Sequence, residues 1–206
     1  MHLLITLQAM NQTAANHSLI LASKSPRRRD LLNQAGLTFT VIPSTVDERA
    51  VAVASPEEHV RLLAEAKAGQ VAQRFPESWV IGADTVVLIE NTILGKPRTQ
   101  SEARHMLEAL SGRTHKVLTG YCICCKYAKR SFSRTVETKV LFKPLTDREM
   151  DWYVSTREPF DKAGGYAAQG LGTFLIQRVE GSYTSVVGLP MCEVVDYLVK
   201  QGVVQR

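Results

Sequence analysis

The chain has 206 residues, of which 45% are hydrophobic and 22% are charged. These proportions are typical of a soluble globular protein with one large domain or two small lobes. No apolar run approaches the roughly 20 residues of a membrane-spanning helix, so we expect no membrane partner. The net charge of +5 favours anionic partners but does not distinguish a nucleotide from a nucleic acid.

Residues 1–17 precede the first predicted element. Met1–Leu7 is apolar, but no basic segment precedes it, and the polar residues that follow lack a clear small-residue cleavage pattern. A secretory signal is therefore a weak interpretation. We predict a poorly ordered extension, or a start codon assigned too early with Met10 as the alternative, followed by one domain over residues 18–206.

The first predicted elements are a strand over Leu19–Leu21, a serine turn, and a helix that ends near Gly36. Ser25 is a suitable N-cap and Pro26 suits the first helical position. Helix N-termini bind anions readily, and the three arginines of residues 27–29 add positive charge at the same end. Because these charges oppose the helix dipole, the pattern favours a phosphate ligand over a solvated basic turn.

A polar loop and a long helix follow. Residues 38–42 predict a short strand, and residues 44–48 predict a loop that ends in two adjacent carboxylates. Ser55 begins a helix of the capping-box type that runs to about Gln73. Lys67 lies on this helix among alanines, and the predicted inward residues are Val60, Leu63, Ala64 and Ala68.

Trp79–Ile89 predicts a central strand, because apolar and β-branched residues flank Asp84 on both sides. A carboxylate at such a position is costly to bury unless it is paired. One interpretation is a capping or ion-paired aspartate in a bulge. The alternative, which we favour, is a metal ligand or general base whose pKa depends on a neighbouring cation.

The remaining elements complete an α/β pattern with a mixed sheet. Gly95-Lys96 resembles the end of a P-loop, but Pro97 occupies the Ser/Thr position and excludes that site, which leaves Lys96 as a candidate phosphate contact. The other predicted segments are the helix Ser101–Leu110, a hairpin of Thr114–Tyr127 and Ser131–Phe142, a helix from Thr146 to Val154, an irregular loop over residues 158–166, the strand Thr173–Val179, a turn at residues 181–183 and the helix Met191–Lys200.

The sequence contains four cysteines, and three of them lie in one predicted strand. Cys122 and Cys125 form a C-x-x-C pair, but strand alternation places them on opposite faces. No second pair follows at the spacing of a zinc site. The cysteines therefore predict buried small side chains in a reducing cytoplasm, in preference to a metal or redox site.

Five motifs resemble those of the Maf family, in order and with plausible spacing. They are Ser-x-Ser-Pro-Arg-Arg at residues 23–28, Gly-Ala-Asp-Thr at residues 82–85, Gly-Lys-Pro at residues 95–97, Ser-Gly-Arg-Thr-His at residues 111–115 and Gly-Ser-Tyr…Val-Gly-Leu-Pro at residues 181–190. The resemblance implies a nucleoside triphosphate pyrophosphatase with an elongated mixed β-sheet flanked by helices, two lobes and a central cleft, as in inosine triphosphate pyrophosphatases. It also implies roles in nucleotide house-cleaning and in cell-division arrest.

The resemblance assigns roles to the residues at the motif positions. Asp84 occupies the position of the family's catalytic proton acceptor. The positions that bind the triphosphate in the family correspond to Ser23, Arg27 and Arg28. The polar positions that line the cleft correspond to Glu48, Lys67 and Lys96.

Residues 158–166 and the Gln-Gly that follows resemble the subgroup that acts on dTTP and UTP. The positions linked with that preference correspond to Arg27, Thr85 and Gln169. Ala168 stands where the subgroup usually has Ile. Its smaller side chain is expected to widen the base pocket, which makes CTP a candidate third substrate. The alternative within the family is a 7-methyl-GTP pyrophosphatase.

Cleavage between the α- and β-phosphates needs a divalent cation, a positioned water and positive charge near the departing pyrophosphate. Glu48 and Asp84 can hold Mg²⁺ or Mn²⁺ through oxygen atoms, and Asp84 or the metal can then activate the water. The arginines, with Lys67 and Lys96, stabilise charge on the phosphates. No covalent enzyme intermediate is expected.

Two classes other than an enzyme remain open. A nucleic-acid-binding regulator would use the basic turn, but the chain lacks the interleaved aromatic residues and basic stripe of such proteins, so we expect no stable nucleic-acid binding. A non-catalytic regulator would bind the nucleotide without turnover. The resemblance also implies a homodimer, which the sequence itself does not test.

Overall fold

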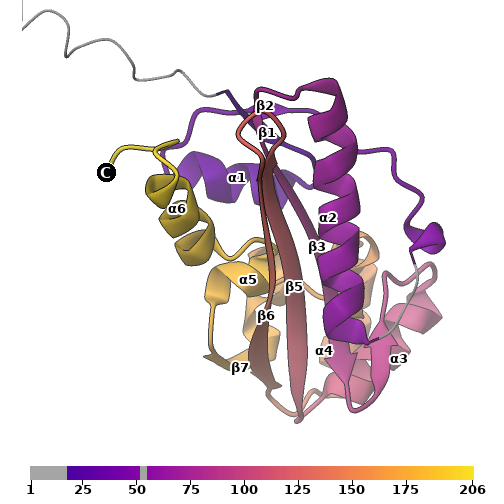
Figure 1. Ribbon diagram of the computed structural model, residues 1–206. Coiled ribbons are helices and arrows are strands. Elements are labelled where there is room, and N and C mark those ends of the chain that lie inside the picture. Colours follow the sequence, from indigo (N-terminus) through magenta and orange to yellow (C-terminus); the bar gives the residue numbers. More distant parts are fainter. Residues whose placement is uncertain (1–17, 52–54) are drawn as a thin grey trace, which may run out of the picture.

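The computed structural model describes residues 18–51 and 55–206, so the predictions about residues 1–17 lie outside the described part. Within that part, seven strands form one mixed sheet in the order β2-β1-β3-β5-β6-β7, with β4 paired to β3 (Figure 1). Strand β1 runs parallel to β2 and β3, and the other pairs are antiparallel. The strands are β1 Leu19–Leu21, β2 Thr40–Val41, β3 Trp79–Ile89, β4 Thr92–Leu94, β5 Thr114–Cys125, β6 Arg130–Phe142 and β7 Ile176–Glu180.

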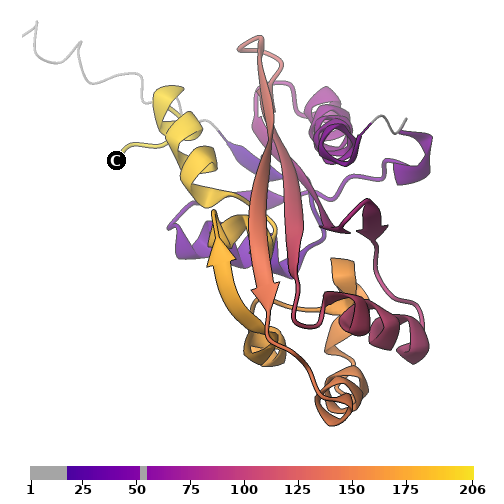
Figure 2. The same cartoon turned by 90° about the horizontal axis from the view of Figure 1, so that it is seen from below.

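Helices cover both faces of the sheet, and the long strands β3, β5 and β6 extend into both lobes (Figures 1 and 2). One lobe packs α1 and α6 on one face and α2 on the other, and α3 and α4 pack against the opposite ends of the long strands. The α-helices are α1 Pro26–Gln34, α2 Pro56–Arg74, α3 Gln100–Leu110, α4 Asp147–Ser155, α5 Tyr183–Val187 and α6 Met191–Lys200. The 3₁₀ helices are η1 Glu48–Ala50, η2 Glu158–Asp161, η3 Ala163–Gly165 and η4 Gly170–Leu175. This arrangement confirms the predicted α/β class with a mixed sheet.

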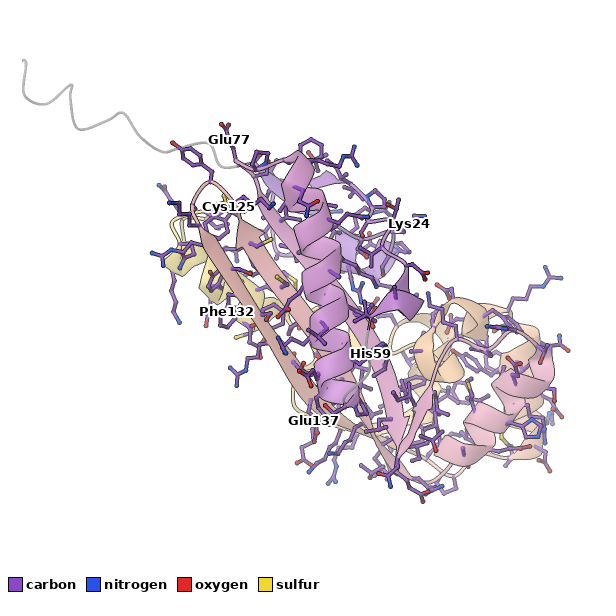
Figure 3. The ribbon with its side chains drawn as sticks, turned by 45° about the vertical axis from the view of Figure 1, so that its right-hand side comes forward. Lys24, His59, Glu77, Cys125, Phe132 and Glu137 are labelled. Carbon is purple, nitrogen blue, oxygen red and sulfur yellow. The ribbon has the colours of Figure 1, made fainter. Side chains whose placement is uncertain are left out.

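Two glycines bring the backbone of α2 into direct contact with the sheet. Figure 3 shows the molecule with this helix in front of the strands. A Cβ atom on Gly82 of β3 would lie 2.4 Å from the carbonyl oxygen of Ala64. A Cβ atom on Gly120 of β5 would lie 2.2 Å from that of Val60. Only glycine fits at these two contacts, so the distance between α2 and β3 is set by backbone atoms.

The parallel pairing of β1 with β3 places the turn between β1 and α1 beside the middle of β3. Leu21 lies opposite Ile81, so the chain leaves β1 for α1 next to the middle of β3, where Asp84 lies. The three residues of β1 are buried, as its apolar sequence predicts. The start of α1 therefore faces the polar positions of β3.

The structure corrects three details of the predicted elements. Strand β7 begins at Ile176, because the glycine-rich segment before it forms η4. Ser182 caps the short helix α5 where we predicted a turn. Ser25 is the N-cap residue of α1, but its side chain makes no capping hydrogen bond.

The structure confirms the prediction that Cys122 and Cys125 lie on opposite faces of one strand. Cys122 and Cys125 are buried in different clusters of the core, on opposite faces of β5, and all four cysteines of the sequence are free thiols. None of the helices in residues 18–51 and 55–206 combines the length and apolar character needed to cross a bilayer.

Candidate active site

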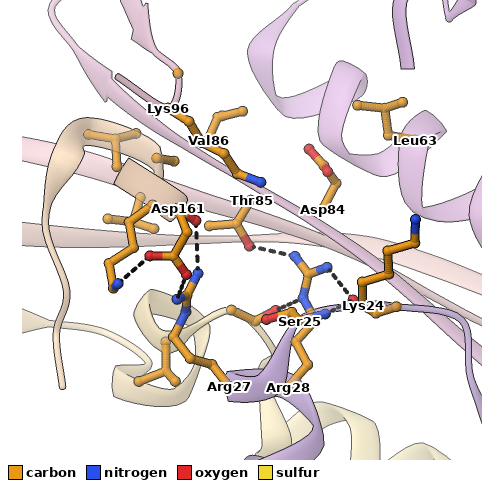
Figure 4. A pocket seen from close by; sticks show the side chains of 18 of the residues that line it. Lys24, Ser25, Arg27, Arg28, Leu63, Asp84, Thr85, Val86, Lys96 and Asp161 are labelled. Atoms are coloured by element: carbon orange, nitrogen blue, oxygen red, sulfur yellow. Dashed lines mark hydrogen bonds and ion pairs between the residues drawn. The ribbon is translucent and has the colours of Figure 1, made fainter. Parts of the chain in front are cut away.

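A cavity of about 1080 Å³ lies where loops from both lobes meet, and it is large enough for a nucleotide. Its walls come from the β1–α1 turn, the η1 segment, α2, β3 and the loops around η2 to η4 (Figure 4). Every residue that the sequence placed in the site lines this cavity, namely Ser23, Arg27, Arg28, Glu48, Lys67, Asp84, Thr85, Lys96 and Gln169.

Two carboxylates share one ammonium group at the centre of the cavity wall. Nζ of Lys67, on α2, lies 2.7 Å from Oδ1 of Asp84 on β3 and 2.7 Å from Oε1 of Glu48 on η1. The side chains of Lys67 and Asp84 are mostly buried, at 12% and 14% exposed, whereas that of Glu48 is 61% exposed. Asp84 is therefore ion-paired in the middle of its strand, which satisfies the requirement that burial imposes on its charge.

The surrounding cations keep Glu48 ionised. Burial alone would raise the pKa of its carboxyl group, but the hydrogen bond from Lys67 and the charges of Lys67, Lys96 and Arg28 outweigh burial. The pKa of Glu48 therefore lies below its ordinary value. A negative carboxylate next to Asp84 at neutral pH is the form that a metal ion or a cationic side chain can bind.

The donor set of this wall fits a divalent cation that also binds phosphate. Asp84 and Glu48 present oxygen atoms toward one point, and hard cations such as Mg²⁺ take oxygen ligands. In the described part of the chain, no three His, Cys, Asp or Glu side chains converge on one point. A site with two carboxylates leaves positions for phosphate oxygens and water, which is the usual arrangement for Mg²⁺ at a nucleotide.

Arg28 is held in place by the protein itself. Its guanidinium group donates to the carbonyl oxygens of Gly188 at 2.7 Å and Ala83 at 2.8 Å, and to the hydroxyl groups of Ser23 and Thr85 at 3.2 Å each. These contacts use four of the five N–H groups of the arginine and leave one for a ligand. Burial lowers the pKa of Arg28, but an arginine remains charged at neutral pH.

Arg27 spans the cavity to the opposite wall. It donates from Nη1 to Oδ2 of Asp161 in η2 at 2.8 Å and from Nη2 to the carbonyl oxygen of the same residue at 3.4 Å (Figure 4). Lys162 also donates to the carboxylate of Asp161. Burial would raise the pKa of Asp161, but hydrogen bonds from Lys162 and Arg27 lower it below its ordinary value.

The basic turn therefore has partners within the protein, which corrects one step of the sequence argument. Arg29 pairs with Asp30, so each arginine of residues 27–29 has an acceptor. Arg27 and Arg29 each pair with a carboxylate, whereas the acceptors of Arg28 are neutral, so the positive charge of the turn is partly compensated before any ligand binds. The cost of the cluster is therefore not by itself evidence for a phosphate. The position of Arg27 and Arg28 on the cavity wall is the stronger argument.

The remaining predicted residues differ in whether their polar groups already have hydrogen-bond partners within the protein. Thr85 accepts from Arg28 and lies 3.0 Å from the hydroxyl group of Thr119. Lys96 is exposed and lies near enough to lower the pKa of Glu48. The half-buried side-chain amide of Gln169 lines the cavity, and no described residue forms a hydrogen bond with it. It is therefore available to a ligand.

Sequence reasoning gave no role to two side chains that belong to the cavity. Asp161 carries the charge that pairs with Arg27. The two residues are 134 positions apart, and no local sequence pattern predicts a pair at that separation. His59 lines the cavity, and its buried Nδ1 has no hydrogen-bond partner among the described residues. Its spacing from Leu63 and Lys67, four and eight positions along α2, is a signal that could have found it.

The chain is similar to curated proteins over most of its length. Curated relatives named "dTTP/UTP pyrophosphatase" include one from Syntrophus aciditrophicus (strain SB), 50% identical over 184 residues, or 89% of this chain and 90% of the relative. Another, from Geotalea uraniireducens (strain Rf4), is 46% identical over 191 residues, which are 93% of this chain and 98% of the relative. A third, from Geobacillus sp. (strain WCH70), is 47% identical over 184 residues, which are 89% of this chain and 98% of the relative.

Solved structures share the fold at low sequence identity. The Ham1 protein from Staphylococcus aureus matches with a TM-score of 0.51 and 12% identity, over 89% of this chain and 99% of that one. The HAM1 protein from Coxiella burnetii matches with a TM-score of 0.50 and 15% identity, over 90% and 99%. A family model described as "Maf-like protein" matches residues 18–201. The chain therefore belongs to the Maf-like protein family.

Proposed function

We propose that this protein is a nucleoside triphosphate pyrophosphatase that hydrolyses dTTP and UTP to the nucleoside monophosphate and pyrophosphate. The observation that carries the proposal is the cavity in which Asp84, Glu48 and Lys67 meet beside the two arginines of α1. A carboxylate pair and several cations in one cavity suit attack of water on a triphosphate. Relatives with this name are 46% to 50% identical over most of the chain.

In the proposed reaction, water attacks the α-phosphorus and the bond to the bridging oxygen of the β-phosphate breaks. Asp84 accepts a proton from the attacking water, and Lys67 holds the Asp84 carboxylate in a fixed orientation at 2.7 Å. Arg27 and Lys96 bind oxygens of the departing pyrophosphate, where negative charge develops. Arg28 holds the turn before α1 against β3, and its remaining N–H group is available to a phosphate oxygen.

We further propose Mg²⁺ or Mn²⁺ as the cofactor, held by Asp84 and Glu48. When bound, the ion neutralises phosphate charge and lowers the pKa of a coordinated water. Lys67, which bridges the two carboxylates, would share them with the ion. The oxygen donors and the ionised state of Glu48 support this assignment.

The choice of base rests in this proposal on Gln169, assisted by Arg27 and Thr85. A side-chain amide offers both a donor and an acceptor, which match the imide edge of uracil or thymine. A site built around such a pair rejects bases that leave its polar groups unpaired. Ala168 is buried beside it and is smaller than the Ile that the family resemblance leads us to expect there, so CTP is a slow third substrate in this proposal.

The experiment that tests the function is pyrophosphate release from a panel of triphosphates at equal subsaturating concentrations, with and without Mg²⁺. We expect UTP and dTTP to be cleaved well ahead of ATP, GTP and 7-methyl-GTP. A higher rate with 7-methyl-GTP would assign the chain to the other branch of the family. Nucleotide binding without turnover would support a non-catalytic regulator, and salt-resistant retention of RNA or DNA on a filter would support a nucleic-acid-binding one.

Two properties complete the proposal. The free cysteines suit a reducing compartment, so we place the enzyme in the cytoplasm, together with the nucleotides it acts on. The homodimer stays a prediction from the family resemblance, and size-exclusion chromatography with light scattering measures it.

A further inference from the structure

The segment that carries Gln169 is tied down on both sides of that residue. We call residues 167–172 the Gln169 loop. On the N-terminal side, the amide N–H of Ala167 donates to the hydroxyl oxygen of Tyr153 at 3.1 Å. The hydroxyl group of Tyr183, on α5, donates to the carbonyl oxygen of Ala168 at 3.1 Å. The two residues before Gln169 are therefore fixed to α4 and to α5.

A single carboxylate holds the C-terminal side of the loop. Glu158 accepts from the amide N–H of Leu171 at 3.1 Å and of Gly172 at 2.8 Å. The hydroxyl group of Tyr153 donates to the same carboxylate at 2.9 Å, so the anchors of the two sides are joined. Burial raises the pKa of Tyr153, which keeps this hydroxyl group protonated and able to donate.

The two glycines of the loop lie in close contact with the residues that anchor it. A Cβ atom on Gly172 would lie 2.5 Å from the carbonyl oxygen of Ala167 and 2.6 Å from the hydroxyl oxygen of Tyr153. A Cβ atom on Gly170 would lie 2.6 Å from Oε2 of Glu158, and Gly170 has a φ of +80°. Both glycines let the chain wrap closely around the carboxylate.

These contacts have a consequence for recognition of the base. The amide of Gln169 has no partner among the described residues, and rotation of its terminal amide exchanges donor and acceptor. An amide that faces N3 and the 4-position of the base could therefore pair with uracil or with cytosine. An amide that faces N3 and O2 matches uracil alone, because both of these atoms are acceptors in cytosine. Which atoms the amide faces depends on the position of the backbone beneath it, which must be held to within a fraction of an ångström.

We propose that Glu158, Tyr153 and Tyr183 are positioning residues that set base selectivity by fixing the Gln169 loop. None of the three lines the cavity, so each acts through the loop and does not touch the substrate. This inference rests on the proposed role of Gln169 in base recognition. It gives a function to parts of two sequence motifs, residues 158–166 and 181–190, that the reaction itself does not use.

The test compares kcat/KM for UTP with kcat/KM for CTP in Glu158→Gln. The amide that replaces the carboxylate has one acceptor oxygen in place of two, so one of the two loop N–H groups loses its partner. We expect the UTP-to-CTP ratio to fall at least tenfold, through a higher KM for UTP, while kcat/KM for CTP changes less than threefold. The matched control is Glu180→Gln, which removes an exposed carboxylate that pairs with Lys139.

Tyr183→Phe is the second variant, because this side chain is 47% exposed and the change removes one hydroxyl group without opening the core. We expect the UTP-to-CTP ratio to fall in this variant too, but by less than in Glu158→Gln. The control is Tyr127→Phe, at a residue that is 79% exposed. An equal loss for UTP and CTP in both variants, with the ratio within threefold of wild type, would overturn the inference.

Gln169→Ala separates this outcome from failure of the proposed function. If Gln169→Ala lowers the UTP-to-CTP ratio and the two anchor variants do not, only the positioning role is wrong. If Gln169→Ala leaves the ratio unchanged, the proposed role of Gln169 in base recognition fails, and the positioning role fails with it.

Discussion

Lys67 and Asp84 are joined by a 2.7 Å contact between Nζ and Oδ1, across the interface of α2 and β3. The contact places a cation and the proposed proton acceptor at a distance that is fixed before any substrate arrives. Because Lys67 also contacts Glu48, loss of either carboxylate leaves the ammonium group with a partner. Either carboxylate can therefore be removed singly without leaving the ammonium group unpaired.

Asp84→Asn tests the proton acceptor. The amide is nearly isosteric, and Glu48 continues to accept from Lys67, so we expect the circular dichroism spectrum to be unchanged. Loss of a general base lowers turnover by about 10²–10⁴-fold. Asp30→Asn, at an exposed residue of α1, is the control and keeps full activity. Turnover of Asp84→Asn within tenfold of wild type would contradict the role of this residue.

Lys67→Met tests the cation. The methionine side chain fills similar space but leaves Asp84 and Glu48 without their shared partner. We expect kcat/KM for UTP to fall by about 10²–10³-fold, the usual effect of removing one preorganised charge contact. Lys139→Met, at an exposed position of β6, should leave the rate unchanged. Equal rates for the two variants would show that the ammonium group serves packing alone.

Arg27→Ala and Arg28→Ala should differ in stability although both weaken catalysis. Each is expected to cost about 2–4 kcal/mol of transition-state stabilisation in kcat/KM. Only Arg28→Ala also removes donors from the carbonyl oxygens of Ala83 and Gly188, which costs about 1–3 kcal/mol of unfolding free energy. Urea denaturation measures that difference. Identical midpoints for the two variants would show that the contacts of Arg28 add nothing to the fold.

Gly82→Ala should push α2 away from β3 and so separate Lys67 from Asp84. The added methyl group meets the backbone of α2 at 2.4 Å, and overpacking of this kind costs about 1–3 kcal/mol. Gly69→Ala, on the same helix, meets nothing within 4 Å and should stabilise by about 0.5–1 kcal/mol. Thermal melts and initial rates of the pair check this, and a Gly82→Ala enzyme with wild-type activity would contradict the close contact.

His115 should make the fold sensitive to mild acid. Burial lowers the pKa of this imidazole from 6.5 to about 4, so between these values the unfolded chain binds more protons than the folded one. Stability is therefore present above pH 6.5 and is lost as the pH falls toward 4, by up to about 3 kcal/mol at 1.36 kcal/mol per pKa unit. Urea unfolding at pH 7 and pH 5 measures the slope.

Replacement of the imidazole isolates this effect. His115 lies against Phe142 and Tyr166, so His115→Phe keeps an aromatic ring in an aromatic environment and should flatten the slope. His105→Phe, at an exposed residue of α3, should leave the slope as in wild type. A variant without His115 that loses as much stability between pH 7 and pH 5 would assign the slope to other groups.

The elements that could be predicted are those whose signal is local. The apolar run of β3 predicted Trp79–Ile89, and the last helix was predicted over Met191–Lys200, both with the bounds that the structure has. Strand β7 was predicted three residues too early, because its glycine-rich approach coils into η4 and no periodic pattern separates the two.

The contacts within the site could not be predicted from such signals. The motif positions indicated which side chains line the cavity, but not that Arg27 pairs with Asp161 or that Arg28 donates to two carbonyl groups. Backbone carbonyl acceptors have no signature in the sequence, and the partners lie 55 to 160 positions away. Pairing at such distances is decided by the topology of the sheet.

The contact between Arg28 and the carbonyl oxygen of Gly188 joins residues 160 positions apart. A growing chain presents Arg28 to the ribosome exit long before Gly188 has been translated. Partial products of synthesis therefore contain most of the charged residues of the site but lack the acceptor that orients this arginine. We therefore expect nucleotide turnover only from chains that have been translated past Gly188 and whose late segment has folded back onto the early one.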